Sequence, residues 1–355
     1  MQGSDISSKL SGLSRLSTTV AVSMALLYFG RPLLVPMSFG LLIAIICYPM
    51  CRWMERKGWT RMLSVGVSIS MVALIFISLI IMLGYEVTVL AEHKPEIISK
   101  LNSTVPEVRQ WLDETLGVRM QTQGDILDNI TNSFSDNGTS LLNGVLSATT
   151  TLVLSLILIP LFAILFLLHR NTFVRFFETV AGENYRDRLT AILHESITSY
   201  FQFVKGTFFV YCIVGALNSA GLLLLGIQHA ILFGMIAAFM TIIPYIGIII
   251  SASLPVAIAL ITKDSWWYAA GVIAVFTFVQ YLEANVIYPR VVGQQLNVST
   301  WAILVTIISG TILWGLSGMI LFVPFVGILK IFSDHIPELK ALNILLSRNP
   351  RVQGK

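Results

Sequence analysis

Charged residues are scarce in this chain. Asp, Glu, Lys and Arg make up 12% of its 355 residues, whereas hydrophobic residues make up 55%. Soluble domains carry about 25% charged residues, so this chain has too little polar surface to cover a water-soluble globule. The composition therefore predicts a polytopic membrane protein. The net charge of +4 comes mainly from Lys and Arg beside apolar runs, which indicates membrane topology rather than nucleic-acid binding.

Cysteines and catalytic motifs are also sparse. The three cysteines, Cys47, Cys51 and Cys212, lie in or next to apolar runs and lack the spacing of a metal site or disulfide framework. The sequence contains no Walker A motif, no His-Glu-x-x-His and no Gly-x-Ser-x-Gly. Intramembrane proteolysis would need paired aspartates or a Ser/His pair inside the spans, and the predicted spans contain no such carboxylate pair. We therefore expect a protein that is not an enzyme and that uses no cofactor or metal.

What the chain does contain is a series of long apolar runs, which predict an all-α polytopic membrane protein with roughly 6–8 transmembrane segments. Clusters of Lys and Arg place both termini in the cytoplasm, and an acidic polar region falls on the opposite side. The pattern predicts five regions. Residues 1–84 form N-terminal membrane helices, namely a hairpin broken near Pro32 and Pro36 and one further span, and residues 85–144 form a small helical extracytoplasmic region. A span and a cytoplasmic amphipathic helix follow over 145–205, then a transport core over 206–332 and a cytoplasmic tail over 333–355.

Two runs in the core, 230–261 and 301–332, are longer than a roughly 30 Å hydrocarbon layer requires. Each contains a similar hexapeptide, Ile-Pro-Tyr-Ile-Gly-Ile from residue 243 and Val-Pro-Phe-Val-Gly-Ile from residue 323. Proline removes a backbone donor and glycine permits unusual dihedral angles, so both runs are predicted to be broken helices. They can be re-entrant hairpins, which would make two inverted repeats, or kinked spans. The residues expected to form a substrate site there are Pro244, Tyr245, Gly247, Pro324, Phe325 and Gly327.

One carboxylate, Glu283, lies in the apolar run between these two segments. A charge at the centre of a membrane helix costs at least ~2.5–3.5 kcal/mol, which makes it a functional candidate. Burial favours the protonated carboxylic acid, so Glu283 could couple transport to a proton or a cation. Its predicted neighbours in this role are Gln280, Asn285 and Arg290, and the helix is predicted to end at Pro289 and Gly293. The alternative interpretation is a structural ion pair between Glu283 and Arg290.

The segment from Gln280 to Gly293, Gln-Tyr-Leu-Glu-Ala-Asn-Val-Ile-Tyr-Pro-Arg-Val-Val-Gly, resembles the autoinducer-2 exporter (AI-2E, PerM-like permease) family, as do 243–247 and 314–324. The resemblance covers nearly the whole chain and is weakest over 85–143. It implies a multi-pass protein of the bacterial inner membrane that exports a small polar molecule such as the quorum-sensing signal autoinducer-2. It also implies a homo-oligomer, with a pentamer as one form.

Three functions are compatible with these features. The first is a secondary transporter for a small-molecule substrate, in contact with membrane lipid and without nucleic acid. The second is a monovalent cation (Na⁺/Li⁺)/proton antiporter, although antiporters often use two intramembrane acids and this chain offers one. The third is a scaffold or receptor whose outer region binds a partner.

Overall fold

The computed structural model describes residues 18–92 (except 20), 149–182, 185–242, 246–263, 265–292 and 297–348, with isolated positions between 93 and 148. The described part is helical, and its one β-bridge joins Val298 to Ser347. The named helices are α2 (Arg31–Arg56), α3 (Arg61–Glu92), α6 (Thr149–Leu168), α7 (Arg170–Ala181), α8 (Arg186–Leu224), α9 (Ala230–Met240), α10 (Ile246–Thr262), α11 (Trp267–Leu282), η2 (Glu283–Ile287), α12 (Tyr288–Val291), α13 (Thr300–Trp314), α14 (Leu316–His335), η3 (Pro337–Leu339) and α15 (Lys340–Leu346).

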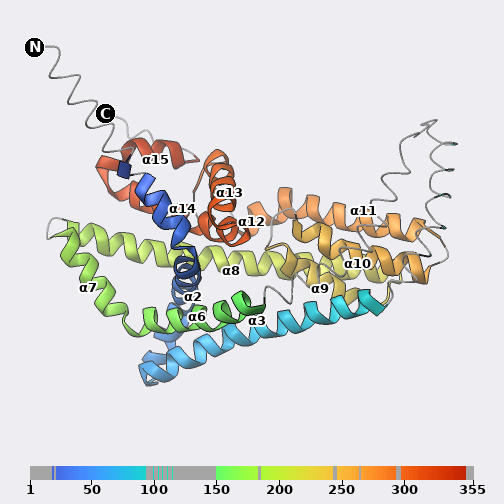
Figure 1. Ribbon diagram of the computed structural model, residues 1–355, viewed down its shortest axis with the longest axis horizontal. Helices are drawn as coiled ribbons and strands as arrows, with labels where there is room; N and C mark the ends of the chain where they lie inside the picture. Colours follow the sequence, from blue (N-terminus) through green and yellow to red (C-terminus); the bar gives the residue numbers. More distant parts are fainter. Residues whose placement is uncertain are drawn as a thin grey trace, which may run out of the picture. The chain divides into compact units, whose positions relative to one another are not determined.

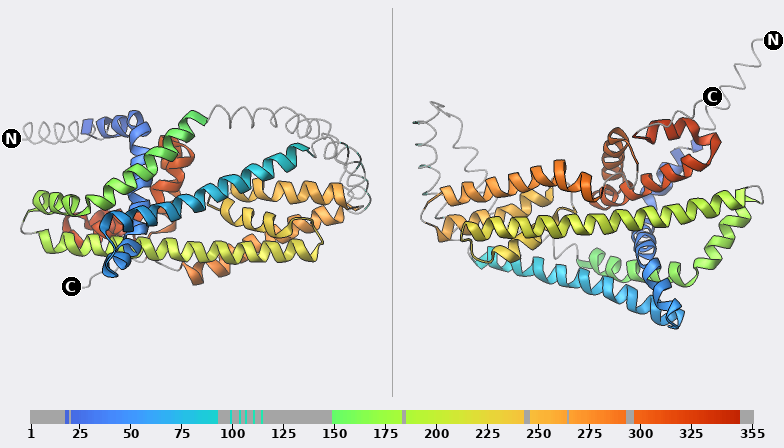
Figure 2. Two further views of the ribbon diagram at one scale, coloured as in Figure 1. Left: turned by 90° about the horizontal axis from the view of Figure 1, so that it is seen from below. Right: turned by 180° about the vertical axis from the view of Figure 1, so that it is seen from behind.

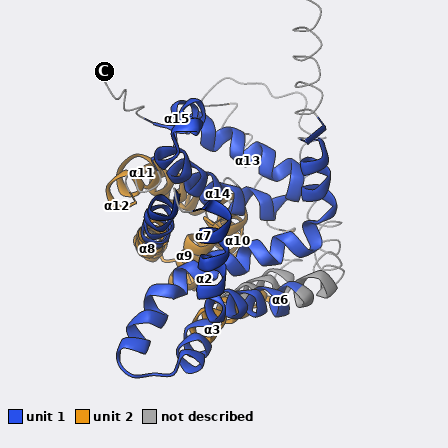
Figure 3. Ribbon diagram, turned by 90° about the vertical axis from the view of Figure 1, so that its left-hand side faces the viewer, with its two compact units in different colours: residues 1–69, 155–201, 295–355 blue, residues 70–154, 202–294 orange. Residues whose placement is uncertain are grey.

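The all-α multi-pass fold is confirmed. Five helices in the described part are long and apolar enough to cross a membrane, and up to six if the bent pair α6 and α7 counts as one span. The chain divides into two compact units, drawn in different colours in Figure 3. Unit 1 comprises residues 1–69, 155–201 and 295–355, and unit 2 comprises 70–154 and 202–294.

The N-terminal membrane helices differ from the expected pair of short spans in one respect. The helix breaks at Gly30, next to Pro32 as predicted, but α2 then runs for 26 residues through both Pro36 and Pro49. The predicted break at Pro36 is therefore wrong. A proline inside a membrane helix is tolerated when neighbouring groups satisfy the carbonyl that it frees. Most of the predicted extracytoplasmic region, 85–144, lies outside the described residues.

The predicted amphipathic helix and the span after it form one continuous helix, α8, of 39 residues. Both views in Figure 2 show it without interruption. At 1.5 Å per residue it is roughly 58 Å long, which exceeds the ~30 Å hydrocarbon thickness. Its N-terminal half has the predicted apolar stripe, because Leu189, Ile192 and Tyr200 are buried while charged residues on the opposite face are exposed.

The first long run of the core is a helical hairpin within unit 2. Helices α9 and α10 pack against each other and against α11 (Figure 1), and they share a core that includes Phe233, Leu254 and Phe276. A side chain at Gly247 would overlap the carbonyl of Met240, so the two helices approach closely beside the break. With 11 and 17 residues, α9 and α10 are each too short to cross the ~30 Å hydrocarbon layer.

The second long run is also a hairpin, in unit 1, but it turns at Gly315 and not at the predicted hexapeptide. Gly315 has φ 62° and ψ −141°, a conformation that only glycine adopts readily. Helices α13 and α14 then pack backbone to backbone, since a side chain on Gly310 would lie 2.5 Å from the carbonyl oxygen of Gly318. Pro324 lies inside the uninterrupted α14, so the predicted break there is wrong.

Candidate functional site

The candidate site in unit 2 is built around Glu283. Its side chain is 6% exposed and lies in a helix that runs from Trp267 to Val291, long and apolar enough to cross a membrane. Glu283 begins a five-residue π-helical turn, η2, between α11 and α12. Such turns add a residue to the helix and are frequent at functional sites. At 1.5 Å per residue, Glu283 lies about 12 Å along the axis from Val291, within the membrane-length helix.

The Glu283 carboxyl group is incompletely satisfied. Its Oε2 is shielded from solvent and has no hydrogen-bond partner among the described residues. Buried polar atoms in native proteins are nearly always hydrogen-bonded, so an exception points to a role in binding or proton exchange. The carboxyl oxygen can be satisfied by a proton, a cation or a donor on a ligand.

Helix α8 presents a polar stripe in the same unit. Thr207, Tyr211 and Asn218 follow the i, i+4, i+11 spacing that places side chains on one helical face. Thr207 Oγ1 and Asn218 Oδ1 are likewise buried without a hydrogen-bond partner in the described part of the chain. Tyr211 and Tyr288 both lie within electrostatic range of the Glu283 carboxylate. Polar atoms with unused hydrogen-bonding capacity therefore lie on α8 in the same unit as the acid.

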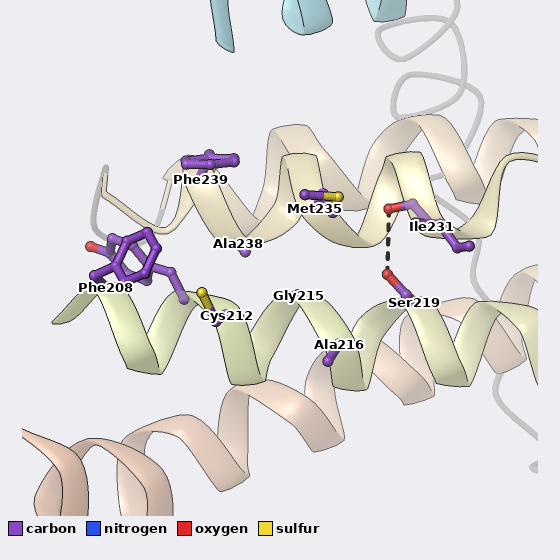
Figure 4. A pocket seen from close by; sticks show the side chains of 10 residues that line it. Phe208, Cys212, Gly215, Ala216, Ser219, Ile231, Met235, Ala238 and Phe239 are labelled. Atoms are coloured by element: carbon purple, nitrogen blue, oxygen red, sulfur yellow. Dashed lines mark hydrogen bonds between the residues drawn. The ribbon is translucent and has the colours of Figure 1, made fainter. Parts of the chain in front are cut away.

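A groove of about 350 Å³ lies between α8 and α9 (Figure 4). Ser219 donates a 3.4 Å hydrogen bond to the carbonyl oxygen of Ile231 across it, and Cys212 and Met235 lie between the two helices. Its lining is mostly apolar and consists of Phe208, Tyr211, Cys212, Gly215, Ala216, Ser219, Ile231, Met235, Ala238 and Phe239. Because Tyr211 lines the groove and also lies near Glu283, it connects the two features.

The residues predicted to assist Glu283 differ in how far they are buried and in what they contact. Gln280 is half-buried one turn before it, whereas Asn285 is exposed and donates a 3.0 Å hydrogen bond to the carbonyl oxygen of Tyr281. Arg290 is exposed, and the described residues show no ion pair between it and Glu283. The extra residue of the π turn rotates Arg290 away from the face that seven α-helical residues would give it, so the proposed ion pair is not formed.

The other predicted site residues that the structure describes lie in the helix of Glu283, at the start of α10 and in α14. Pro289 does not end its helix, which continues to Val291. Gly293, Pro244 and Tyr245 lie outside the described residues. Gly247 is buried at the first break, while Pro324, half-buried Phe325 and Gly327 lie within α14 in unit 1.

Sequence reasoning missed Lys330, which is only 2% exposed near the end of α14. Its Nζ donates to both carboxylate oxygens of Asp334, at 2.5 and 2.7 Å, and Asn343 Nδ2 donates to Oδ1 of the same group. The i, i+4 spacing of Lys330 and Asp334 is the signal in the sequence that could have indicated this pair. Tyr211 had no such signal, because only the folded chain brings it near Glu283.

Taken together, the fold and the site define a multi-pass membrane protein with a buried carboxylate in a membrane-length helix and a groove between α8 and α9 in the same unit. Comparison with known proteins agrees, because the sequence profile of the AI-2E family transporters matches residues 18–338. The chain belongs to this transporter family.

Individual relatives cover most of the chain. It is 26% identical to MT0215, a candidate transport protein of Mycobacterium tuberculosis, over 90% of this chain and 84% of the relative. It is 26% identical to YueF, a candidate transport protein of Bacillus subtilis, over 88% and 86%. It is 23% identical to the AI-2 transport protein TqsA of Escherichia coli, over 90% of each chain.

Proposed function

We propose that this protein is a secondary transporter that exports a small polar molecule, such as autoinducer-2, and couples export to an ion gradient. The observation that carries the proposal is Glu283, a buried intramembrane carboxylate with an unpartnered oxygen, next to a tyrosine that lines a groove. The name of TqsA supports autoinducer-2 as the substrate class.

The coupling role follows from the energetic cost of an ionised carboxylate in hydrocarbon. Glu283 is stable there when it is protonated, paired with a cation or hydrogen-bonded to a ligand. A conformational change that opened the groove to one side would let the carboxyl group exchange its partner with that side. Thr207, Tyr211 and Asn218 supply hydrogen-bonding groups on α8 for a polar solute or for water that accompanies the ion.

The proposal includes a location and an assembly. The distribution of Lys and Arg supports a bacterial inner-membrane protein with both termini in the cytoplasm. A homo-oligomer is part of the same proposal.

A cation/proton antiporter is the second candidate, and one observation favours it. Among the ten residues that line the groove, only Tyr211 and Ser219 have polar side chains apart from the Cys212 thiol. Such a lining offers few groups that would recognise an organic solute, whereas a carboxylate alone can exchange a proton for a small cation.

Reconstituted flux measurements test the proposal. Proteoliposomes with an imposed proton or sodium gradient are prepared with purified wild type, with Glu283→Gln or with the control Glu338→Gln. The efflux of labelled autoinducer-2 is then measured. Glu338 is exposed in unit 1, so its substitution makes the same chemical change outside the site. We expect Glu283→Gln to reduce gradient-dependent flux to that of protein-free liposomes and Glu338→Gln to retain it. Equal flux in all three proteins would refute the coupling role, and gradient-dependent Na⁺ or Li⁺ flux without solute flux would favour the antiporter.

A further inference from the structure

Helix α7 has the character of a helix that lies in a membrane surface. It bends away from α6 by 68° and has no buried residue among its 12. Phe173, Phe176 and Phe177 are 40–59% exposed, and Arg175 lies on the same short helix. A strongly amphipathic helix with exposed aromatic and basic residues is typical of the interface between headgroups and acyl chains.

The start of α7 meets the end of α2 and the start of α3 in a group of three charged side chains, all in unit 1. We call Glu55, Arg61 and Arg170 the basic cluster. Arg170 Nη2 donates a 2.6 Å hydrogen bond to Glu55 Oε2, and Arg61 Nη2 donates a 2.8 Å hydrogen bond to the carbonyl oxygen of Leu167. Arg170 alone pairs with the Glu55 carboxylate, so the three side chains carry a net charge of +1 at a partly buried position.

The hydrogen bonds of the basic cluster are incomplete. Arg61 Nε, Arg170 Nη1 and Glu55 Oε1 are shielded from solvent and have no partner among the described residues. The two nitrogens are donors that match the oxygens of a phosphate group, and the carboxylate oxygen is an acceptor that matches a hydroxyl group. A ligand that carries both a phosphate and a hydroxyl matches the hydrogen-bonding types of all three atoms.

The surroundings of the cluster point to a lipid source for this ligand. Trp53 in the last turn of α2 is 57% exposed, and Trp59 in the turn between α2 and α3 is 47% exposed. Lys57 Nζ lies 3.8 Å from the centre of the Trp53 ring. Exposed tryptophans beside basic residues mark the headgroup level of a bilayer. Basic pockets between membrane helices on the positively charged side bind anionic headgroups.

We infer that the basic cluster binds the headgroup of an anionic phospholipid with a free hydroxyl, of the phosphatidylglycerol type, while α7 lies in the same leaflet. Arg61 and Arg170 bind the phosphate, and Glu55 accepts a hydrogen bond from the headgroup hydroxyl. This lipid site is independent of Glu283 and of the proposed transport function.

The first test is lipid retention by the full-length protein, purified in detergent, measured by native mass spectrometry during titration with phosphatidylglycerol and with phosphatidylcholine. We expect wild type to retain phosphatidylglycerol preferentially and Arg61→Gln to bind it at least about tenfold more weakly, since charge-assisted hydrogen bonds are lost. The matched control is Arg56→Gln, which removes the same charge from an exposed position at the end of α2 and should bind as wild type does. Equal weakening by both variants would show unspecific attraction and would overturn the site.

A second variant guards against a folding defect in Arg61→Gln. Glu55→Gln removes the internal counter-charge of Arg170, while the glutamine amide oxygen can still accept the headgroup hydroxyl, so this variant should weaken helix packing yet bind phosphatidylglycerol more tightly than wild type. A purely structural ion pair predicts no change in lipid affinity for either variant, and that result overturns the inference. Thermal stabilisation by inorganic phosphate equal to that by phosphatidylglycerol would identify a free phosphate as the ligand and would reject the lipid.

Discussion

The crossing of α8 and α9 beside the groove gives a sharp test of the site geometry. At Gly234 of α9 an added Cβ would overlap Ser219 Oγ and the Ser219 backbone nitrogen, and it would lie 2.7 Å from Ser219 Cα. Two of these three atoms belong to the backbone, which no rotamer change can move. Gly234→Ala must therefore separate the two helices.

The size of the effect can be worked from these contacts. Ordinary contact begins near 3.4 Å, so the helices must part by roughly 1 Å at this point. Overpacking of this kind costs about 1–3 kcal/mol. Alanine recovers up to about 1 kcal/mol through its higher helix propensity, so we expect a net destabilisation of about 1–2 kcal/mol. Small residues at such crossings are the usual means by which membrane helices pack closely.

Gly221 of α8 provides a matched comparison. There the three atoms nearest to an added Cβ all belong to the side chain of Val275, with Cγ2 at 3.1 Å and Cβ at 3.3 Å. Val275→Ala removes the overlapping atoms, so Gly221→Ala should be close to neutral in the Val275→Ala background. Ser219→Ala leaves the backbone atoms in place, so Gly234→Ala should remain destabilising in that background.

The assay is thermal unfolding of the purified proteins in one detergent, analysed as two double-mutant cycles. The Gly221–Val275 cycle should show a coupling energy that cancels most of the Gly221→Ala effect, and the Gly234–Ser219 cycle should show little coupling. Full rescue of Gly234→Ala by Ser219→Ala, or wild-type stability of Gly234→Ala alone, would refute the backbone contact between α8 and α9.

Three further outcomes follow from the structure. Gly315→Ala should lose about 1–3 kcal/mol of stability, because alanine is strained at the positive φ of this position. Steric overlap adds nothing, since no atom lies within 4 Å of the added Cβ. An unchanged unfolding temperature would contradict the positive φ. Asp334→Asn should lower the free energy of unfolding by about 1–3 kcal/mol, because it leaves buried Lys330 without its charged partner. Lys330→Met should stay within about 1 kcal/mol of wild type. If thermal unfolding showed Lys330→Met to be the less stable variant, Lys330 would not be buried as the structure has it. A membrane-permeant maleimide should label Cys212 in the groove but not the two buried cysteines of α2, and bound substrate should slow the labelling of Cys212. Labelling that persists in Cys212→Ser would count against this assignment. A labelling rate that substrate does not change would count against the groove as the binding site.

The fold class could be predicted from the sequence because apolar runs longer than the bilayer thickness leave few alternatives to membrane helices. The positions of the breaks were harder. Pro324 looked like a helix breaker, but α14 passes through it. Gly315 makes the turn through a backbone conformation that the sequence does not reveal, since Gly310 and Gly318 nearby look the same and serve instead for close packing.

The candidate site was predicted in part for similar reasons. Glu283 was identified because a carboxylate in an apolar run is rare and costly. Arg290 was paired with it on the assumption of α-helical spacing, and the π turn that changes the spacing leaves no sequence pattern. Tyr211 lies 72 positions earlier in the chain, so only the packing of α8 against α11 and α12 relates it to the acid.

The two hairpins also bear on the idea of an inverted repeat. The matched hexapeptides are eighty positions apart, but the first begins at the break between α9 and α10, while the second begins eight residues after the turn at Gly315. The two hexapeptides therefore lie at different places relative to the turns of their hairpins, and the match does not by itself establish a repeat. If unwound backbone binds the substrate in both hairpins, substitutions next to Gly315 should alter transport more than substitutions at Pro324, which lies about 14 Å further along α14.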